Sequence, residues 1–222
     1  MAALESTVPD YEIVVVDDGS TDDSGARADR LAAANPRVRV VHNQRNMGIG
    51  YSYARGYQAA RKAFVVYIPG DNTWPSQSCA KLFGGLGQAD IVVSYASNPG
   101  IRPFGRRLVS ALYTRTVNLL FGQRMPYYNG LNIFPASFLR ALPPMAFGFG
   151  FQAEVLLRAL AAGMSHVEIA VPISERAVGR SKAVTARNIV GVAVTVVRLL
   201  WELRIAPLLK RLPAANNQRH QP

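Results

Sequence analysis

The chain has 222 residues, 49% of them hydrophobic and 18% charged, which suits one globular domain with a sizeable core. Its 25 Lys and Arg against 14 Asp and Glu give a formal net charge of +11, which favours anionic partners such as phosphorylated molecules or acidic lipid. No zinc-ligand spacing or nucleic-acid-binding motif is present, so nucleic acid is disfavoured, and the single cysteine, Cys79, excludes an intramolecular disulfide and is interpreted as a packing residue.

The first half of the chain alternates between strand and helix patterns. Residues 12–16 are a β-branched run typical of a buried parallel strand, and a helix to about Ala34 and a strand at 38–41 follow. A helix at about 51–62, a strand at about 64–68, a helix near 76–86 and a strand at 91–95 continue the alternation. This order predicts an α/β fold with a mostly parallel sheet flanked by helices.

Two turns in this half are candidates for ligand binding. The strand at 64–68 stops at Pro69-Gly70-Asp71, and ligands of open α/β sheets bind beyond the carboxyl ends of strands. Asp71 is therefore placed to hold a metal ion or a ligand hydroxyl. Gly48 and Gly50 lie in a strand-to-helix turn, where backbone N–H groups can approach a phosphate, although glycine there more often serves the turn alone.

The second half is richer in arginine and aromatic residues. A helix is predicted from Arg106-Arg107 to about residue 121, with an apolar stripe that is interpreted as core: Val109, Tyr113, Val117 and Leu120. Arg106, Arg107 and Arg115 fit a solvated basic face and a phosphate-binding site equally well. Residues 127–134 are expected to line a pocket. A helix at about 152–162 and an edge strand at 167–172 follow.

The last helical pattern covers residues 186–209. Its apolar run at 189–197 is shorter than the ~20 residues that span a bilayer. Arginines interrupt and flank the run, which favours a helix lying at the membrane surface against acidic headgroups; the alternative is a helix buried on the sheet or in a dimer contact. We therefore divide the chain into a main domain at 1–185, an amphipathic helix at 186–212 and a disordered tail at 213–222.

The order of four motifs is distinctive. They are Val-Val-Val-Asp-Asp-Gly-Ser at 14–20, Arg-Asn-Met-Gly-Ile-Gly at 45–50, the strand ending at Asp71, and Arg-x-x-Gly-x-Ser-Lys at 176–182. Over residues 9 to 205 this series resembles family 2 glycosyltransferases of the GT-A fold. It is most similar to the dolichol- or polyprenyl-phosphate sugar synthases, which transfer a sugar from a nucleotide donor to a lipid phosphate.

The resemblance implies a role for each matching residue. Asp71 matches the last aspartate of the family's Asp-x-Asp motif, which holds a divalent ion, Mg²⁺ or Mn²⁺, on the donor diphosphate, so it is the expected catalytic and metal-binding residue. Arg106 and Arg107 lie near the expected site of the acceptor phosphate. The remaining expected donor-binding residues are Asp17, Asp18, Gly48, Gly50, Arg176, Ser181 and Lys182.

The chemistry of the acceptor separates the alternatives. A lipid phosphate is already anionic and needs no general base, whereas a sugar hydroxyl would need one. Glu154 is the candidate for that base, although an ion pair with Arg158 four residues later is its more natural role. The implied protein is a peripheral enzyme on the cytoplasmic face of a membrane, with its oligomeric state left open. The other alternative is a non-catalytic relative that binds nucleotide or lipid.

Two departures from the family pattern stand out. Pro69 occupies the position of the first aspartate of Asp-x-Asp, and proline cannot ligate a metal. Family members also begin with a strand and a Pro-x-Tyr-Asn-Glu-like loop before the Asp-Asp-Gly-Ser strand. We find no such segment here, so we expect either a truncated chain or a rearranged, inactive site.

Overall fold

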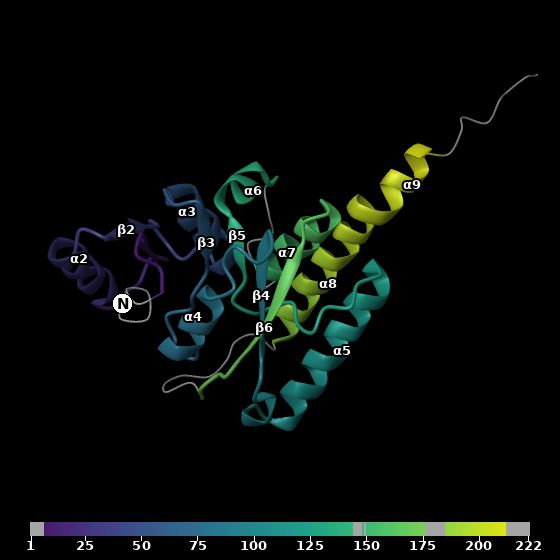
Figure 1. Cartoon of the computed structure of the whole chain (residues 1–222), viewed down its shortest axis with the longest axis horizontal. Coiled ribbons are helices and arrows are strands. Elements are labelled where there is room, and N and C mark those ends of the chain that lie inside the picture. Colours follow the sequence, from purple (N-terminus) through teal and green to yellow (C-terminus); the bar gives the residue numbers. More distant parts are fainter. Residues whose placement is uncertain (1–6, 144–147, 149, 176–184, 212–222) are drawn as a thin grey trace, which may run out of the picture.

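The computed structural model describes residues 7–143, 148, 150–175 and 185–211, and it contains two sheets (Figure 1). In the first, β1 (Ile13–Asp17) and β2 (Val38–His42) pair in parallel and are joined by α2 (Ser24–Ala34). α3 (Ile49–Ala59) then leads to β3 (Phe64–Val66) in the second sheet. The predicted β-α-β unit at the start of the chain is confirmed.

The second sheet has the strand order β3-β5-β4-β6, with β4 at Ile91–Ala96, β5 at Ile133–Pro135 and β6 at His166–Val171. β6 pairs in parallel with β4 at one edge, as predicted, but β5 is antiparallel to both β3 and β4. The expected α/β fold with parallel strand pairs is confirmed, and β5 is the antiparallel exception. Residues 130–132 approach the sheet beside Ser94, whose amide donates to Asn132 at 3.3 Å, and β5 then runs back along β4.

β1 and β3 each have one edge on which the described chain places no strand. Their starts are close, because the Glu12 carboxylate accepts hydrogen bonds from the amides of Arg61 and Lys62 at 2.5 and 3.1 Å. All five residues of β1 are half-buried, whereas β4 begins with fully buried side chains. At these two edges, no described strand pairs with the backbone N–H and C=O groups of β1 and β3.

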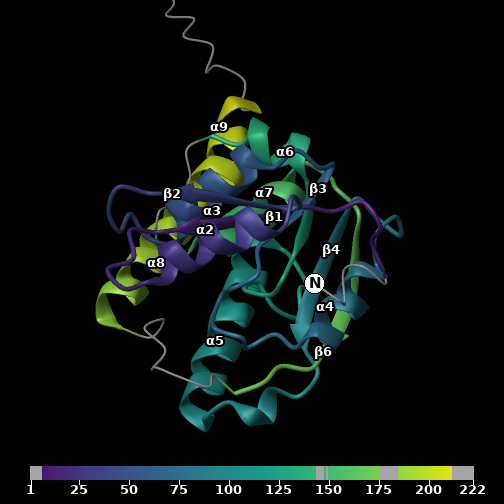
Figure 2. The same ribbon diagram turned by 90° about the vertical axis from the view of Figure 1, so that its left-hand side faces the viewer.

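The helices that follow β3 in the chain lie beside the second sheet. They are α4 (Ser76–Phe83), the 3₁₀ turn η1 (Pro99–Ile101), α5 (Phe104–Phe121), α6 (Ala136–Ala141), α7 (Phe151–Ala161), α8 (Ala186–Leu200), the π-helical turn η2 (Trp201–Ile205) and α9 (Ala206–Arg211). α5 and α8 run side by side in both views (Figures 1 and 2). Within the described ranges, no helix combines the length and the apolar character that crossing a membrane requires.

Two apolar clusters hold these layers together. The larger joins the second sheet to α3, α5, α7 and α8 through residues such as Tyr53, Val117 and Phe151. The smaller packs α4 against the other face and contains Cys79. Burial raises the pKa of the Cys79 thiol, so the group stays protonated, as expected of a packing residue.

Candidate active site

Asp18 links two of the predicted donor-binding motifs, the strand end at 14–20 and the glycine turn at 45–50, through hydrogen bonds. Its Oδ1 accepts hydrogen bonds from Asn43 Nδ2 at 2.8 Å and the Met47 amide at 2.9 Å, and its Oδ2 accepts one from the Gly48 amide at 2.8 Å. Burial by itself would raise the pKa of Asp18, but the hydrogen bonds from Met47, Asn43 and Gly48 outweigh it and lower the pKa. Gly48 has φ +92°, which glycine adopts without strain. Asp18 thus shapes the turn at 43–50 while remaining ionised.

Asp17 is held by its own loop and by a histidine. Its Oδ1 accepts a bond from the Ser20 amide at 3.0 Å, and its Oδ2 lies 3.0 Å from His42 Nδ1. The other ring nitrogen of His42 lies 2.9 Å from Asp29 Oδ1 on α2. Both ring nitrogens can donate only in the imidazolium form, and the bonds to Asp17 and then Asp29 raise the pKa of His42. The bonds from Ser20 and then His42 lower the pKa of Asp17.

We expect the stability that the contacts of His42 with Asp17 and Asp29 provide to fall at both high and low pH. The His42 contribution to stability is complete below its unfolded pKa and is lost as pH rises through the raised folded value; the Asp17 contribution is lost as pH falls through its lowered value. In an NMR titration, the His42 ring should show a midpoint above the ordinary value of about 6.5. Asp17→Asn should lower that midpoint. Asp90 lies just before β4 and accepts a hydrogen bond from the Ser165 amide, so the control variant Asp90→Asn should leave the midpoint unchanged.

Asp71 lies in a tight turn after β3. Its Oδ1 accepts bonds from Thr73 Oγ1 at 2.7 Å and the Thr73 amide at 3.2 Å, and Asn72 between them has φ +56°. Across the described ranges, no group of three or more His, Cys, Asp or Glu is placed to hold a metal. One carboxylate nevertheless fits a Mg²⁺ or Mn²⁺ ion whose other ligands are phosphate oxygens and water.

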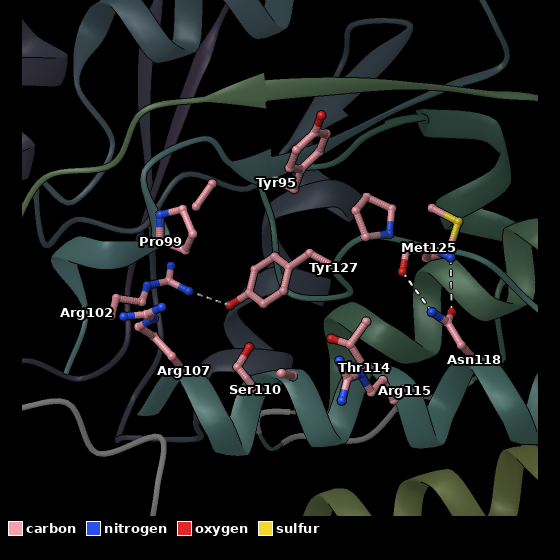
Figure 3. Close-up of a pocket in the computed structure, with 13 residues that line it drawn as sticks. Tyr95, Pro99, Arg102, Arg107, Ser110, Thr114, Arg115, Asn118, Met125 and Tyr127 are labelled. Carbon is pink, nitrogen blue, oxygen red and sulfur yellow. Dashed lines mark hydrogen bonds between the residues drawn. The ribbon is translucent and has the colours of Figure 1, made fainter. Parts of the chain in front are cut away.

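A cavity of about 410 Å³ opens at the carboxyl end of β4, between that strand and α5 (Figure 3). Its charged lining consists of Arg102, Arg107 and Arg115, and none of the described residues that line it is acidic. Arg102 Nη1 donates to Tyr127 Oη at 3.2 Å, and its guanidinium lies 5.5 Å from the centre of that ring. Hydroxyl groups of Ser110 and Thr114 complete a basic, donor-rich lining that suits a phosphate.

A short extended segment links this cavity to the Asp71 turn. Asn98 donates to the Ile173 carbonyl at 2.9 Å and accepts from the Ile173 amide at 2.8 Å. The next amide, that of Ser174, donates to the Thr73 carbonyl at 3.0 Å. Asn98, which precedes the cavity residue Pro99, and the Asp71 turn are therefore both attached to the segment that follows β6.

The structure unites some of the predicted site residues and separates others. Arg107 lines the cavity, whereas Arg106 is not among the lining residues. Arg102 was missed, although it lies in the connection that follows β4, just after η1, and the rule that favoured Asp71 applies to that strand end as well. Within the predicted pocket lining, Tyr127 reaches the cavity but Tyr128 is core. The predicted residues Arg176, Ser181 and Lys182 lie outside the described residues.

Glu154 is unsuited to the work of a general base. Its side chain is fully buried and accepts bonds from Arg158 at 3.0 Å and Arg198 at 2.6 Å. The predicted ion pair with Arg158 is confirmed. A fully buried carboxylate that is bonded to two guanidinium groups has no route to a substrate hydroxyl in a water-exposed site.

Two proteins of known function are similar to this chain over most of its sequence. An undecaprenyl-phosphate mannosyltransferase of Micrococcus luteus is 29% identical over 208 residues, which cover 87% of this chain and 84% of that protein. A polyprenol monophosphomannose synthase of Mycolicibacterium smegmatis is 30% identical over 187 residues, covering 78% and 71% of the two chains.

The fold has relatives of known structure. Glucosyl-3-phosphoglycerate synthase from Mycobacterium tuberculosis, crystallised with Mn²⁺, UDP-glucose and phosphoglyceric acid, superposes with a TM-score of 0.62 at 21% identity, over 88% of this chain and 74% of that one. The expected GT-A fold is confirmed. The family model of glycosyl transferase family 2 matches residues 2–141, a span that includes Asp18, the glycine turn, Asp71 and the arginine-lined cavity. This chain belongs to glycosyl transferase family 2.

Proposed function

We propose that this glycosyltransferase moves a sugar from a nucleotide-sugar donor to a polyprenyl phosphate at a membrane surface. The observation that carries the proposal is the arginine-lined cavity, joined through Ile173 and Ser174 to the turn that holds Asp71. It provides one place for an anionic acceptor and an adjacent place for the donor diphosphate. The names of the two mannosyltransferase relatives support the same acceptor class.

The acceptor half of the site needs binding and orientation more than proton transfer. A phosphate oxygen is a competent nucleophile without deprotonation, so the guanidinium groups of Arg102, Arg107 and Arg115 hold and aim it. The Tyr127 hydroxyl fixes Arg102 in place. The engagement of Glu154 within its ion pairs disfavours the alternative of a sugar hydroxyl acceptor.

The donor half supplies charge stabilisation. Asp71 would hold a divalent ion against the diphosphate, and such an ion neutralises charge on the leaving group when it is bound. Asp17 and Asp18, kept ionised by their hydrogen bonds, would bind the nucleoside, with Gly48 and Gly50 forming the turn beneath it. Arg176, Ser181 and Lys182 remain part of the proposal as a loop closing over the donor. We propose that the reaction takes place at the cytoplasmic face of a membrane.

Sugar transfer tests the proposal directly. Purified protein is incubated with Mn²⁺, undecaprenyl phosphate and a panel of radiolabelled nucleotide sugars, and label is counted in the organic phase. We expect label from one donor, and none when the unphosphorylated polyprenol replaces its phosphate. Label that enters a sugar hydroxyl acceptor instead, or nucleotide binding without transfer to any acceptor, would contradict the proposal and favour one of the two alternatives.

Arg107 and its neighbour Arg106 offer a matched pair for the acceptor site. Arg107→Ala removes a charge from the cavity and should lower kcat/KM for the lipid phosphate by about tenfold to a hundredfold, with donor affinity unchanged. Arg106→Ala removes the same charge from a helix position outside the lining and should stay much closer to the wild type. Equal losses in both variants would show that general basicity, not the cavity, recruits the acceptor.

A further inference from the structure

One side of α5 exposes an apolar stripe that the core does not use. Its members are bulky and mostly exposed: Phe104 73%, Leu108 59%, Leu112 65% and Leu119 84%. At 3.6 residues per turn they lie within an arc of about 80°. The predicted core stripe is only partly correct, since Val117 is buried but Val109 is 46% exposed. α5 therefore has a buried apolar face and a separate exposed one, and large exposed apolar patches mark interaction sites.

α8 and the π-helical turn after it expose a second stripe. Val190, Val194, Val197 and Trp201 follow one another at helical spacing, and each is more than half exposed. The opposite side of α8 faces the protein, where Thr195 and Leu199 are buried. This helix is thus amphipathic in the folded protein, with its hydrophobic row turned outward.

Ion pairs fix the outward direction of that row. Arg198 of α8 donates to Glu154 of α7 at 2.6 Å, and Arg158 of α7 donates to Glu202 of η2 at 2.6 Å. Rotating α8 to hide its apolar row would break these contacts and expose the buried Glu154. The end of α5 lies against η2, because a Cβ atom added at Gly122, just after α5, would meet the Arg204 guanidinium of η2. The two stripes therefore belong to adjacent helices whose positions are set.

We propose that the exposed stripes of α5 and α8 together form a docking face for a bilayer that contains anionic lipids. The charge of the two helices decides between a bilayer and a second copy. The sequence of α5 contains three arginines and no acidic residue, and the chain as a whole carries +11. Two such faces in contact would bring like charges together, whereas anionic headgroups attract them.

The arginine-lined cavity lies on the flank of α5 next to this docking face. Ala111 and Arg115 line the cavity, and Leu108 and Leu112 come next around the helix. A lipid with its phosphate in the cavity could therefore extend its apolar chain along the docking face into the bilayer. In this respect the inference rests on the proposed function, and it assigns α5 two tasks, binding the phosphate in the cavity and lipid on the adjacent face.

Vesicle co-sedimentation tests the docking face without donor or acceptor. The full chain is mixed with vesicles of phosphatidylglycerol and phosphatidylcholine, or of phosphatidylcholine alone. We expect binding to the anionic vesicles that weakens with added salt. Leu112→Glu and Val194→Glu, on separate helices, should each lower the partition coefficient by about tenfold or more. The matched control is Leu31→Glu on α2, an equally apolar side chain that is 58% exposed away from the docking face, and it should bind as the wild type does.

Three results would overturn the docking face: wild-type vesicle binding by both face variants, an equal loss in Leu31→Glu, or a concentration-dependent dimer in light scattering that Leu112→Glu abolishes while vesicle binding persists.

Transfer to a water-soluble short-chain isoprenyl phosphate separates this inference from the proposed function. Val194→Glu, on α8 and outside the cavity lining, should retain that transfer while losing vesicle binding. Thermal unfolding of each variant confirms that it is folded. Vesicle binding that depends on Leu112 and Val194, in a protein that transfers no sugar, would support the face and count against the function alone.

Discussion

Replacing Asp71 with asparagine is expected to lower the rate of sugar transfer by about a hundredfold to a thousandfold, because the carboxylate that would hold the divalent ion loses its charge. The substitution is chosen for its small structural cost. An asparagine side-chain oxygen can still accept the bonds from the Thr73 hydroxyl and amide, so the turn is preserved. The measurement is kcat for transfer at saturating donor and acceptor, across a series of Mn²⁺ concentrations.

Thr73→Val is the matched control for this change. It removes the hydroxyl bond to Asp71 but leaves the carboxylate and the backbone bond, so its kcat should fall less than about tenfold. A chelator should abolish wild-type transfer, and Mn²⁺ should restore it. An Asp71→Asn enzyme with a rate near that of the wild type, and an unchanged Mn²⁺ requirement, would show that the ion is held elsewhere.

The features that the sequence predicts correctly are those carried by local patterns. β-branched runs mark β1, β2 and β4, and the Pro-Gly-Asp-Asn sequence marks the turn after β3, while the role of Asp71 stays a prediction. The start of α8 at Ala186 is also correct, since Thr185 caps it through its side chain, which accepts a bond from the Asn188 amide at 3.3 Å. Each of these signals is read within a few residues along the chain.

The features that the sequence does not predict depend on contacts between distant segments. Asp18 and Gly48 are 30 residues apart, and no local pattern states that the carboxylate fastens the turn. The cavity joins Arg102 to Tyr127 across 25 residues and the whole of α5. β5 is only three residues long, too short for a period, and its antiparallel direction follows from the path of the chain.

Glu154 shows how such a long-range contact alters an interpretation. Local spacing alone correctly pairs it with Arg158, but the folded chain adds Arg198 and Glu202 from 44 or more residues away. A residue considered as a catalytic base is thereby part of the attachment of α8 to α7. Because a buried charge is tolerated only when it is paired, removing any buried member of this group is expected to cost more stability than removing an exposed one.

Glu154→Ala is expected to lower the free energy of unfolding by about 3 kcal/mol, since it leaves Arg158, almost buried, and Arg198 to share the single carboxylate of Glu202. The matched control is Glu202→Gln in the same network. Its side chain is 38% exposed, so water replaces the lost pairing and the cost should stay below about 1 kcal/mol. Urea denaturation of both variants measures the difference. Equal costs would mean that α8 is attached by its apolar packing through Leu199, and that the ion pairs only orient it.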